Sequence, residues 1–223
     1  MKRLRNRLKE TPAVVRTAPF IIFLCLTFIQ LAPGETTPFW AYLAKSIVGV
    51  LLVWLTLPLV AELKWRIGWE GVAVGGIVFG LWVGLEGRYP VFQESGSNWN
   101  PFAVFGESAP MAWMFVCVRI VGSTLLVPLL EEVFYRSFLY RWIARPDFEG
   151  ADLGRFEWKP FLLVSLVFGL AHREWLAGLL TGALLQWLVL RRRDLGDALT
   201  AHAVANLLLG GWVVWREHWV FWS

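Results

Sequence analysis

Long apolar runs alternate with short polar segments along almost the whole chain. A transmembrane helix needs about 20 mostly apolar residues, and most of these runs approach that length. The pattern predicts an all-α, polytopic transmembrane bundle of about seven or eight helices, the eighth being a short interfacial helix in the tail "WVVWREHWVFWS". The seven expected spans are roughly 17–33, 39–61, 70–86, 111–142, 160–172, 175–190 and 197–215.

The composition agrees with a membrane protein. Hydrophobic residues make up 57% of the 223 residues and charged residues 17%, whereas soluble domains average about 45–50% apolar residues. The 15 tryptophans fit the aromatic belts found at membrane boundaries. The net charge of +4 comes from basic residues scattered over short inter-helix segments, so nucleic-acid binding is not expected. Both cysteines lie singly inside apolar runs, which predicts neither a disulfide nor a thiolate metal site.

Lysine and arginine predict the orientation in the membrane. With the N-terminus in the cytoplasm, 16 of the 21 basic residues fall on the cytoplasmic side and three on the opposite side, as the positive-inside rule requires. Residues 1–16 are then a basic cytoplasmic arm and residues 17–223 a single transmembrane domain. Segment 143–158 is expected in the cytoplasm and loop 87–110 outside. The predicted location is a multi-pass position in the plasma membrane, which is the inner membrane in a bacterium.

Six polar residues interrupt three of the expected spans, although charged and polar groups are costly at bilayer depth. They are Glu131, Glu132, Arg136, His172, His202 and Asn206. At 1.5 Å per residue, the distance is about 15 Å from Arg141 to Glu131, about 20 Å from Lys159 to His172 and about 13 Å from Arg193 to His202, each measured from a basic residue near the cytoplasmic end of the span. This shared depth predicts one common polar site. Histidines in membrane helices also serve as plain helix–helix hydrogen bonders, which is the structural alternative.

Local spacing refines this site. Glu132 and Arg136 are four residues apart, as are His202 and Asn206, so each pair shares one helix face and the first pair can form an ion pair. Glu131 is turned about 100° away from Glu132 and is therefore free for another role.

Other polar or helix-breaking positions match no motif. Pro128 should weaken the helix just before the glutamates. Lys45 and Arg119 lie inside apolar spans and are interpreted as buried ion-pair or snorkelling residues, with contact to a substrate as the alternative. Three further polar residues are expected near a turn or a helix interface: Arg173, Glu174 and Gln186.

Three motifs follow one another on successive spans. They are EExxxR in "EEVFYR" (131–136), FxxxH in "FGLAH" (168–172) and HxxxN in "HAVAN" (202–206). In this order they resemble the CAAX protease and bacteriocin-processing family of intramembrane glutamate endopeptidases, whose best-known member is the Ras-converting CAAX protease. The resemblance covers residues 111–215. The segment "RIVGSTLLVPLLEEVFYRSFL" is similar to sequences of the CAAX prenyl protease-related subgroup. Some members of this subgroup are associated with exosortase systems.

The resemblance implies a peptide hydrolase without a cofactor. In such an enzyme Glu131 and His172 would activate a water, and His202 and Asn206 would donate hydrogen bonds to the oxyanion of the intermediate. Three residues would support them: Glu132, Arg136 and Phe168. The implied partners are the lipid bilayer and a membrane-associated protein or peptide, either prenylated or a sorting or leader peptide, with an exosortase system as a further association.

Alternatives of other classes stay open on the sequence. Two glutamates, two histidines and an asparagine could hold Zn²⁺ in a zinc-dependent membrane protease, although no HExxH motif occurs. A non-catalytic membrane scaffold or immunity protein could keep the same fold. Buried Glu and His also build proton relays, but the inverted repeats that many carriers show are not visible in the sequence.

Overall fold

The computed structural model describes residues 7–91 and 99–222. Within these ranges there is no strand, and seven long helical segments follow the seven expected spans, so the all-α prediction is confirmed. The segments are α2 (Pro12–Thr27), α3 (Thr37–Thr56), α4 (Trp69–Leu85), the continuous helix Pro110–Ala144, α9 (Trp158–Leu170), α10 (Trp175–Arg192) and α11 (Gly196–Arg216). The described part also contains a five-residue helix, α5 (Pro101–Phe105), and 3-10 turns at Phe28–Leu31, Leu57–Leu59, Phe148–Gly150 and Trp219–Trp222.

The continuous helix 110–144 runs through the middle of the bundle and is not uniform. It consists of α6 (Pro110–Val121), a π-helical stretch (Gly122–Leu126), α7 (Val127–Glu132), a second π-helical stretch (Val133–Tyr140) and α8 (Arg141–Ala144). π-helical turns are uncommon and are frequent at functional sites. The two glutamates of the EExxxR motif therefore stand at the end of a short α-helical piece between two widened segments.

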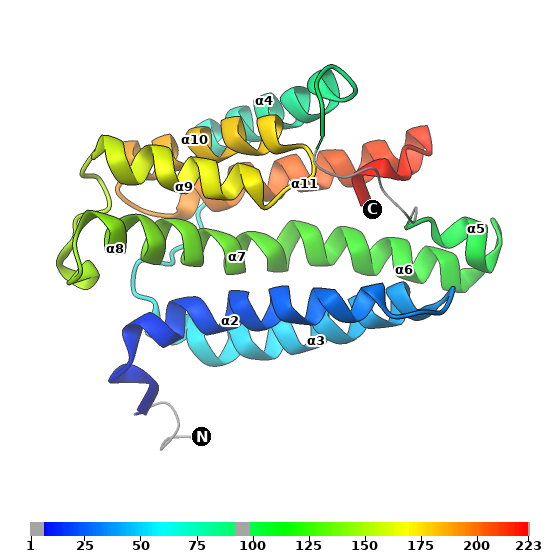
Figure 1. The fold of residues 1–223 in the computed structure, drawn as a ribbon, viewed down its shortest axis with the longest axis horizontal. Coiled ribbons are helices and arrows are strands. Elements are labelled where there is room, and N and C mark those ends of the chain that lie inside the picture. The colour runs from blue at the N-terminus through cyan, green and yellow to red at the C-terminus, as the bar shows by residue number, and fades with distance from the viewer. Residues whose placement is uncertain (1–6, 92–98, 223) are drawn as a thin grey trace.

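The helices form layers around this central helix (Figure 1). The pair α2 and α3 packs on one side of it. On the other side lie α4, α9, α10 and α11, with α4 running along α11 and α9 along α10. Gly75 permits the close approach of α4, because a Cβ there would lie 2.7 Å from the carbonyl oxygen of Ala201 in α11. The arrangement brings residues that are far apart in sequence to the middle of the bundle.

Helix boundaries differ from the expected ones at two places. α2 begins at Pro12, because proline is favoured in the first turn of a helix, where its missing N–H is not needed. Residues 12–16 of the expected arm are therefore helical. α9 ends at Leu170, so His172 lies in the turn between α9 and α10 and not inside a span.

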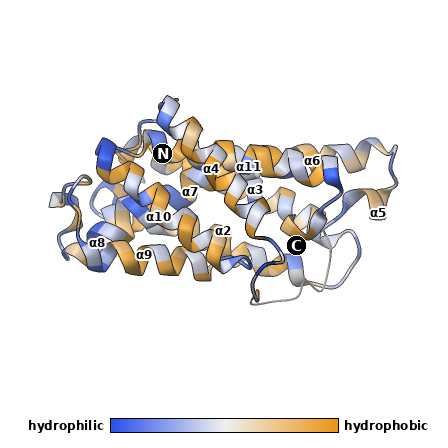
Figure 2. Ribbon diagram, turned by 90° about the horizontal axis from the view of Figure 1, so that it is seen from above, coloured by the Kyte–Doolittle hydropathy of each residue, from blue (hydrophilic) through white to orange (hydrophobic). Residues whose placement is uncertain are grey.

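The surface is that of an integral membrane protein. Large apolar side chains of α3 such as Ile47, Val50 and Trp54 are exposed, and hydrophilic residues gather mainly near the end of the bundle that holds α8 (Figure 2). Among the described residues, four helices are long and apolar enough to cross a membrane: 12–30, 37–59, 110–144 and 196–216. α4 and α9 are apolar but shorter, so length and composition alone single out four of the seven expected spans.

Candidate functional site

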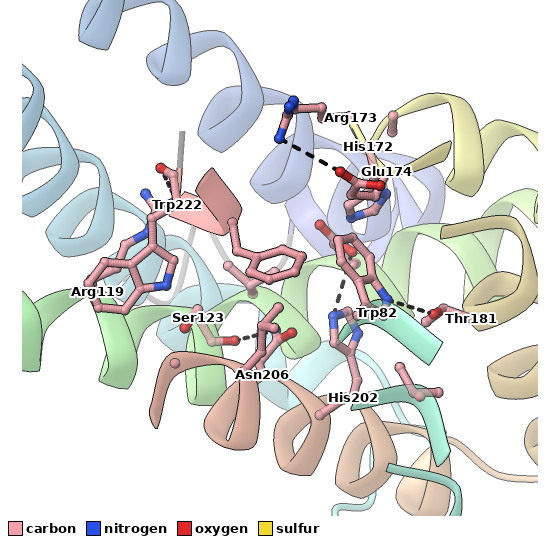
Figure 3. A pocket seen from close by; sticks show the side chains of 18 of the residues that line it. Trp82, Arg119, Ser123, His172, Arg173, Glu174, Thr181, His202, Asn206 and Trp222 are labelled. Atoms are coloured by element: carbon pink, nitrogen blue, oxygen red, sulfur yellow. Dashed lines mark hydrogen bonds and ion pairs between the residues drawn. The ribbon is translucent and has the colours of Figure 1, made fainter. Parts of the chain in front are cut away.

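A cavity of about 320 Å³ lies between the central helix, α3, α4, α11 and the turn after α9. Five of the residues expected at the polar site line it: Glu131, Phe168, His172, His202 and Asn206. Glu132 and Arg136 are fully buried beside it, with 0% of either residue exposed. Figure 3 shows residues of the α9–α10 turn, α4 and α11 gathered around this cavity. Residues of all three motifs therefore lie at or beside one cavity.

His202 lies between the two glutamates. Its Nδ1 is 3.0 Å from Oε1 of Glu132, and its Nε2 is 3.9 Å from Oε2 of Glu131. The second oxygen of Glu132 accepts a hydrogen bond of 3.1 Å from Nε of Arg136, which is the ion pair expected from their spacing. An ionised carboxylate only accepts hydrogen bonds, so Nδ1 of His202 carries the hydrogen that Glu132 receives. Nε2 of His202 is then the nitrogen on the Glu131 side.

Glu131 differs from Glu132 in how its oxygens are used. Oε2 of Glu131 is buried and, among the residues that the structure describes, has no hydrogen-bond partner. A buried carboxylate oxygen without a partner is unfavourable unless a group in the cavity supplies a hydrogen bond. No pair within 4.0 Å joins Glu131 to His172 in the described part of the chain, so the two side chains can act together only through something that lies between them.

His172 is fixed by its neighbours. Its Nδ1 lies 2.7 Å from the carbonyl oxygen of Phe168, and because a carbonyl only accepts, Nδ1 carries the hydrogen. The imidazole packs against the Phe168 ring at 4.8 Å and edge-on to Trp82 at 5.5 Å between ring centres. In the neutral tautomer that this bond selects, Nε2 of His172 is left as a hydrogen-bond acceptor.

Asn206 is held by a carbonyl that the central helix does not use. Its Nδ2 donates to the Ser123 carbonyl at 2.8 Å. In the π-helical turn, the N–H of Val127 bonds to the Gly122 carbonyl, and the next residue, Pro128, has no N–H to offer to Ser123. The proline thus frees the acceptor that orients Asn206, whose second amide hydrogen remains available. This consequence of Pro128 is more specific than the weakened helix expected from the sequence.

Arg136 is stabilised by more than its ion pair. Its guanidinium carbon lies 5.1 Å from the ring centre of Phe168 and 5.7 Å from that of Tyr135. Its two terminal nitrogens are buried without hydrogen-bond partners among the described residues. Arg136 therefore acts as a fixed positive charge behind Glu132, held by one carboxylate and two aromatic faces.

Sequence reasoning missed several residues that share the cavity. Lys45 and Arg119 line it, as do Trp82, Arg173 and Glu174 and the C-terminal residues 220–222. The signal for Lys45 and Arg119 was their charge inside an apolar span, the same signal that marked Glu131 and His202. In the tail, which the sequence predicts to be interfacial, Trp222 packs against Trp99, their ring centres lying 5.5 Å apart.

The donors in this region do not resemble a metal centre. Across the described ranges, no group of three or more His, Cys, Asp or Glu side chains is arranged to hold a metal ion. Zinc sites usually need three or four such ligands at about 2.0–2.3 Å. The zinc alternative therefore gains no support from this geometry.

Fold and site together define a polytopic helical membrane protein with a buried carboxylate–imidazole site. Residues 112–208 match the family model described as type II CAAX prenyl endopeptidase Rce1-like. The matched segment contains all three motifs, so the resemblance to the CAAX protease family is confirmed, and this family implies a protease. No curated protein and no solved structure matches the chain.

Proposed function

We propose that this protein is an intramembrane glutamate endopeptidase. It would hydrolyse a peptide bond near the end of a membrane-associated or lipidated protein or peptide. The observation that carries the proposal is the buried Oε2 of Glu131, a residue that lines the cavity, which has no hydrogen-bond partner among the described residues. Such an oxygen is suited to hold and deprotonate a water.

The arrangement of side chains supports a specific course of reaction. A water between Glu131 and Nε2 of His172 would donate one hydrogen to each. As its oxygen attacks the peptide carbonyl carbon, Glu131 takes the proton, and it later gives this proton to the leaving amine when the C–N bond breaks. The oxyanion would accept hydrogen bonds from the second N–H of Asn206 and, with both ring nitrogens protonated, from Nε2 of His202.

Glu132 and Arg136 have a positioning role in this proposal. Glu132 accepts from Nδ1 of His202 and so fixes which way the imidazole faces. Arg136 holds the Glu132 side chain in place through its ion pair. Supporting groups that lock the rotamer of a reacting side chain are a general requirement of precise sites. The non-catalytic scaffold alternative does not account for the unpartnered oxygen of Glu131.

Cleavage of a defined peptide tests the proposal. The purified protein in detergent is incubated with a farnesylated fluorogenic peptide and with the same peptide lacking the lipid, and mass spectrometry locates the cut. We expect the lipidated peptide to be cut and His172→Ala to lose at least about 10²-fold of the rate, the low end for a general-base group. A folded wild-type protein that cuts neither this peptide nor any native protein accumulating in a deletion strain would favour the scaffold alternative.

The orientation is a second proposal, supported by the 16-to-3 distribution of basic residues. We propose that the N-terminus and residues 143–158 are cytoplasmic and that loop 87–110 is external. Single cysteines at Asp152 and Glu107, both exposed, are labelled with a membrane-impermeant reagent in intact cells, in a background without the native cysteines. Glu107→Cys should be labelled and Asp152→Cys protected, and the reverse result inverts the topology. Ser95, in the same loop, lies outside the described residues.

A further inference from the structure

The cavity has a second, basic end. Lys45 of α3 and Arg119 of α6 line it together with the glutamate site. Lys45 is only 6% exposed, and its Nζ donates to Thr27 Oγ1 at 3.0 Å. Arg119 is half-buried. Within the described part of the chain, neither cation has a carboxylate oxygen within 4.0 Å, whereas the buried Arg16, Arg136 and Arg141 each have one.

Neutral groups orient these two cations without neutralising them. The guanidinium carbon of Arg119 lies 4.5 Å from the ring centre of Tyr42, and Nζ of Lys45 lies 5.0 Å from the same centre, so the charges flank one ring. Arg119 also stacks near Trp99 at 5.1 Å and donates from Nη2 to the Trp222 carbonyl at 3.1 Å. Two positive charges near one another in a low-dielectric site are unfavourable unless an anion joins them.

One wall of the cavity connects this basic end to Glu131. Arg119, Ser123, Val127 and Glu131 follow one another at intervals of four on the central helix, and all four line the cavity. In Figure 3, Arg119 and His202 lie on opposite sides, with Ser123 between them. Twelve residues of helix correspond to about 18 Å, while an extended peptide advances about 3.3 Å per residue. Allowing for the reach of the side chains, roughly three to five peptide residues span the two ends.

We propose that Lys45 and Arg119 form a carboxylate-binding subsite for the free C-terminus of the peptide substrate. A C-terminal carboxylate seated there would receive charge-assisted hydrogen bonds from both side chains. It would also neutralise the buried charge and place a peptide bond a few residues upstream beside Glu131. The Trp222 carbonyl bound to Arg119 indicates that this end accepts a main-chain oxygen. The proposal rests on the proposed function, because it assigns which end of the substrate the cavity holds.

Binding without turnover tests the subsite. The Glu131→Gln variant in detergent is titrated with a fluorescent farnesylated peptide that has a free C-terminal acid, and with the same peptide as a C-terminal amide. We expect the acid to bind about tenfold more tightly, as hydrogen bonds to charged groups allow. Adding Lys45→Met should reduce this preference to less than about twofold, while Lys45→Arg should retain most of it.

Lys64→Met is the matched control, because it is the same chemical change at an exposed lysine outside the cavity, and it should leave the preference intact. A melting curve for each variant shows whether it is folded, and the acid-to-amide ratio is compared only among folded variants. If Lys45→Met does not fold, Arg119→Lys, which keeps the charge but loses the planar guanidinium, should weaken the preference for the acid in its place.

Three results would overturn the subsite. They are equal binding of acid and amide, a preference that survives Lys45→Met, and binding that follows the phosphatidylglycerol content of nanodiscs regardless of the peptide terminus. The last would assign the cations to a lipid phosphate.

The outcomes separate the subsite proposal from the proposed proteolytic function. If wild type cuts both peptides equally well, the subsite alone fails, and if the acid preference holds while nothing is cut, the proteolytic function alone fails.

Discussion

Two buried carboxylate clusters contact the same central helix, and they differ in how their oxygens are used. At one, Glu62 of the segment between α3 and α4 has partners on both oxygens. At the other, Glu131 keeps a buried oxygen without a hydrogen-bond partner among the described residues. Both sites place a carboxylate beside cations in the bundle. Burial of charge therefore does not distinguish a structural site from a reactive one. The distinguishing feature is whether both carboxylate oxygens have hydrogen-bond partners.

The Glu62 cluster ties three elements together. Arg16 of α2 donates from Nε and Nη2 at 2.8 and 3.0 Å, Arg141 of α8 donates from Nη2 at 2.5 Å, and the Ser137 hydroxyl also donates to Glu62. Burial alone would raise the pKa of Glu62, but the hydrogen bonds from Arg16 and Ser137 outweigh it and lower the pKa to about 2. Both oxygens of Glu62 accept hydrogen bonds from the protein, so this carboxylate is not available to bind and deprotonate a water.

The largest expected effect separates these two carboxylates by activity. Glu131→Gln keeps the shape of the side chain and removes the base, so cleavage should fall by at least about 10²-fold. Thermal stability in detergent should be nearly unchanged, because Oε2 of Glu131 makes no hydrogen bond among the described residues and its nearest charged neighbour, Nε2 of His202, is 3.9 Å away. The measurement is a peptide-cleavage assay paired with a melting curve.

Glu62→Gln is the matched control for this variant, since it makes the same substitution in a carboxylate whose oxygens are occupied. It should melt earlier yet retain wild-type activity per folded molecule. If Glu131→Gln cleaves normally while folded Glu62→Gln does not, then Glu62 is the reactive carboxylate and Glu131 the structural one. Full activity in both Glu131→Gln and His172→Ala would contradict the hydrolase proposal itself.

Glu132→Gln should show the next largest effect, on stability. Glu132 is the only described carboxylate within 4.0 Å of Arg136, and both residues are completely buried. Removing one partner of a buried ion pair costs about 3–5 kcal/mol, and an amide that still accepts one hydrogen bond should bring the loss to the lower end. Equilibrium unfolding in detergent measures it. Activity should decline with the folded fraction, so a variant that is inactive but as stable as wild type would exchange the roles of Glu131 and Glu132.

A smaller effect follows from the pH dependence of Glu62. Its folded pKa of about 2 lies below the ordinary value of 4.5, so its contribution to stability is present above about pH 4.5 and is lost as the pH falls toward 2. The melting temperature of wild type should therefore decline more steeply over this window than that of Glu62→Gln. Other carboxyls titrate in both proteins, and the difference between the two curves isolates Glu62. Parallel curves would show that its ion pairs do not contribute.

The comparison also shows what the sequence could predict. The spans, the i,i+4 ion pair of Glu132 with Arg136 and the convergence of three motifs follow from helical periodicity and depth, which are local properties. Contacts between helices do not follow from them. The 100° offset between Glu131 and Glu132 suggested separate surroundings, yet His202 of α11 lies between both, because an imidazole presents nitrogens on two sides.

Two further features depended on tertiary structure. Asn206 is oriented by a carbonyl that a π-helical turn and Pro128 leave free, and no spacing rule reveals a π turn. Lys45 and Arg119 come from different helices and meet at one ring, that of Tyr42. The position of each cation within an apolar span of the sequence predicted that it lies in the membrane. Only the packing of α3 against the central helix brings the two cations to the same cavity.

The smallest expected effect is that of metal removal. Oε2 of Glu131 and Nε2 of His172 can share a water without a metal ion, so EDTA or 1,10-phenanthroline should leave peptide cleavage by the purified protein within about twofold of the untreated rate. This prediction sharpens the comparison of Glu131 with Glu62. A bound metal ion would contact Oε2 of Glu131, the oxygen that has no hydrogen-bond partner among the described residues. Elemental analysis should accompany the assay. About one tightly bound zinc per chain, lost with the activity and restored with it, would replace the metal-free mechanism with the zinc-dependent one.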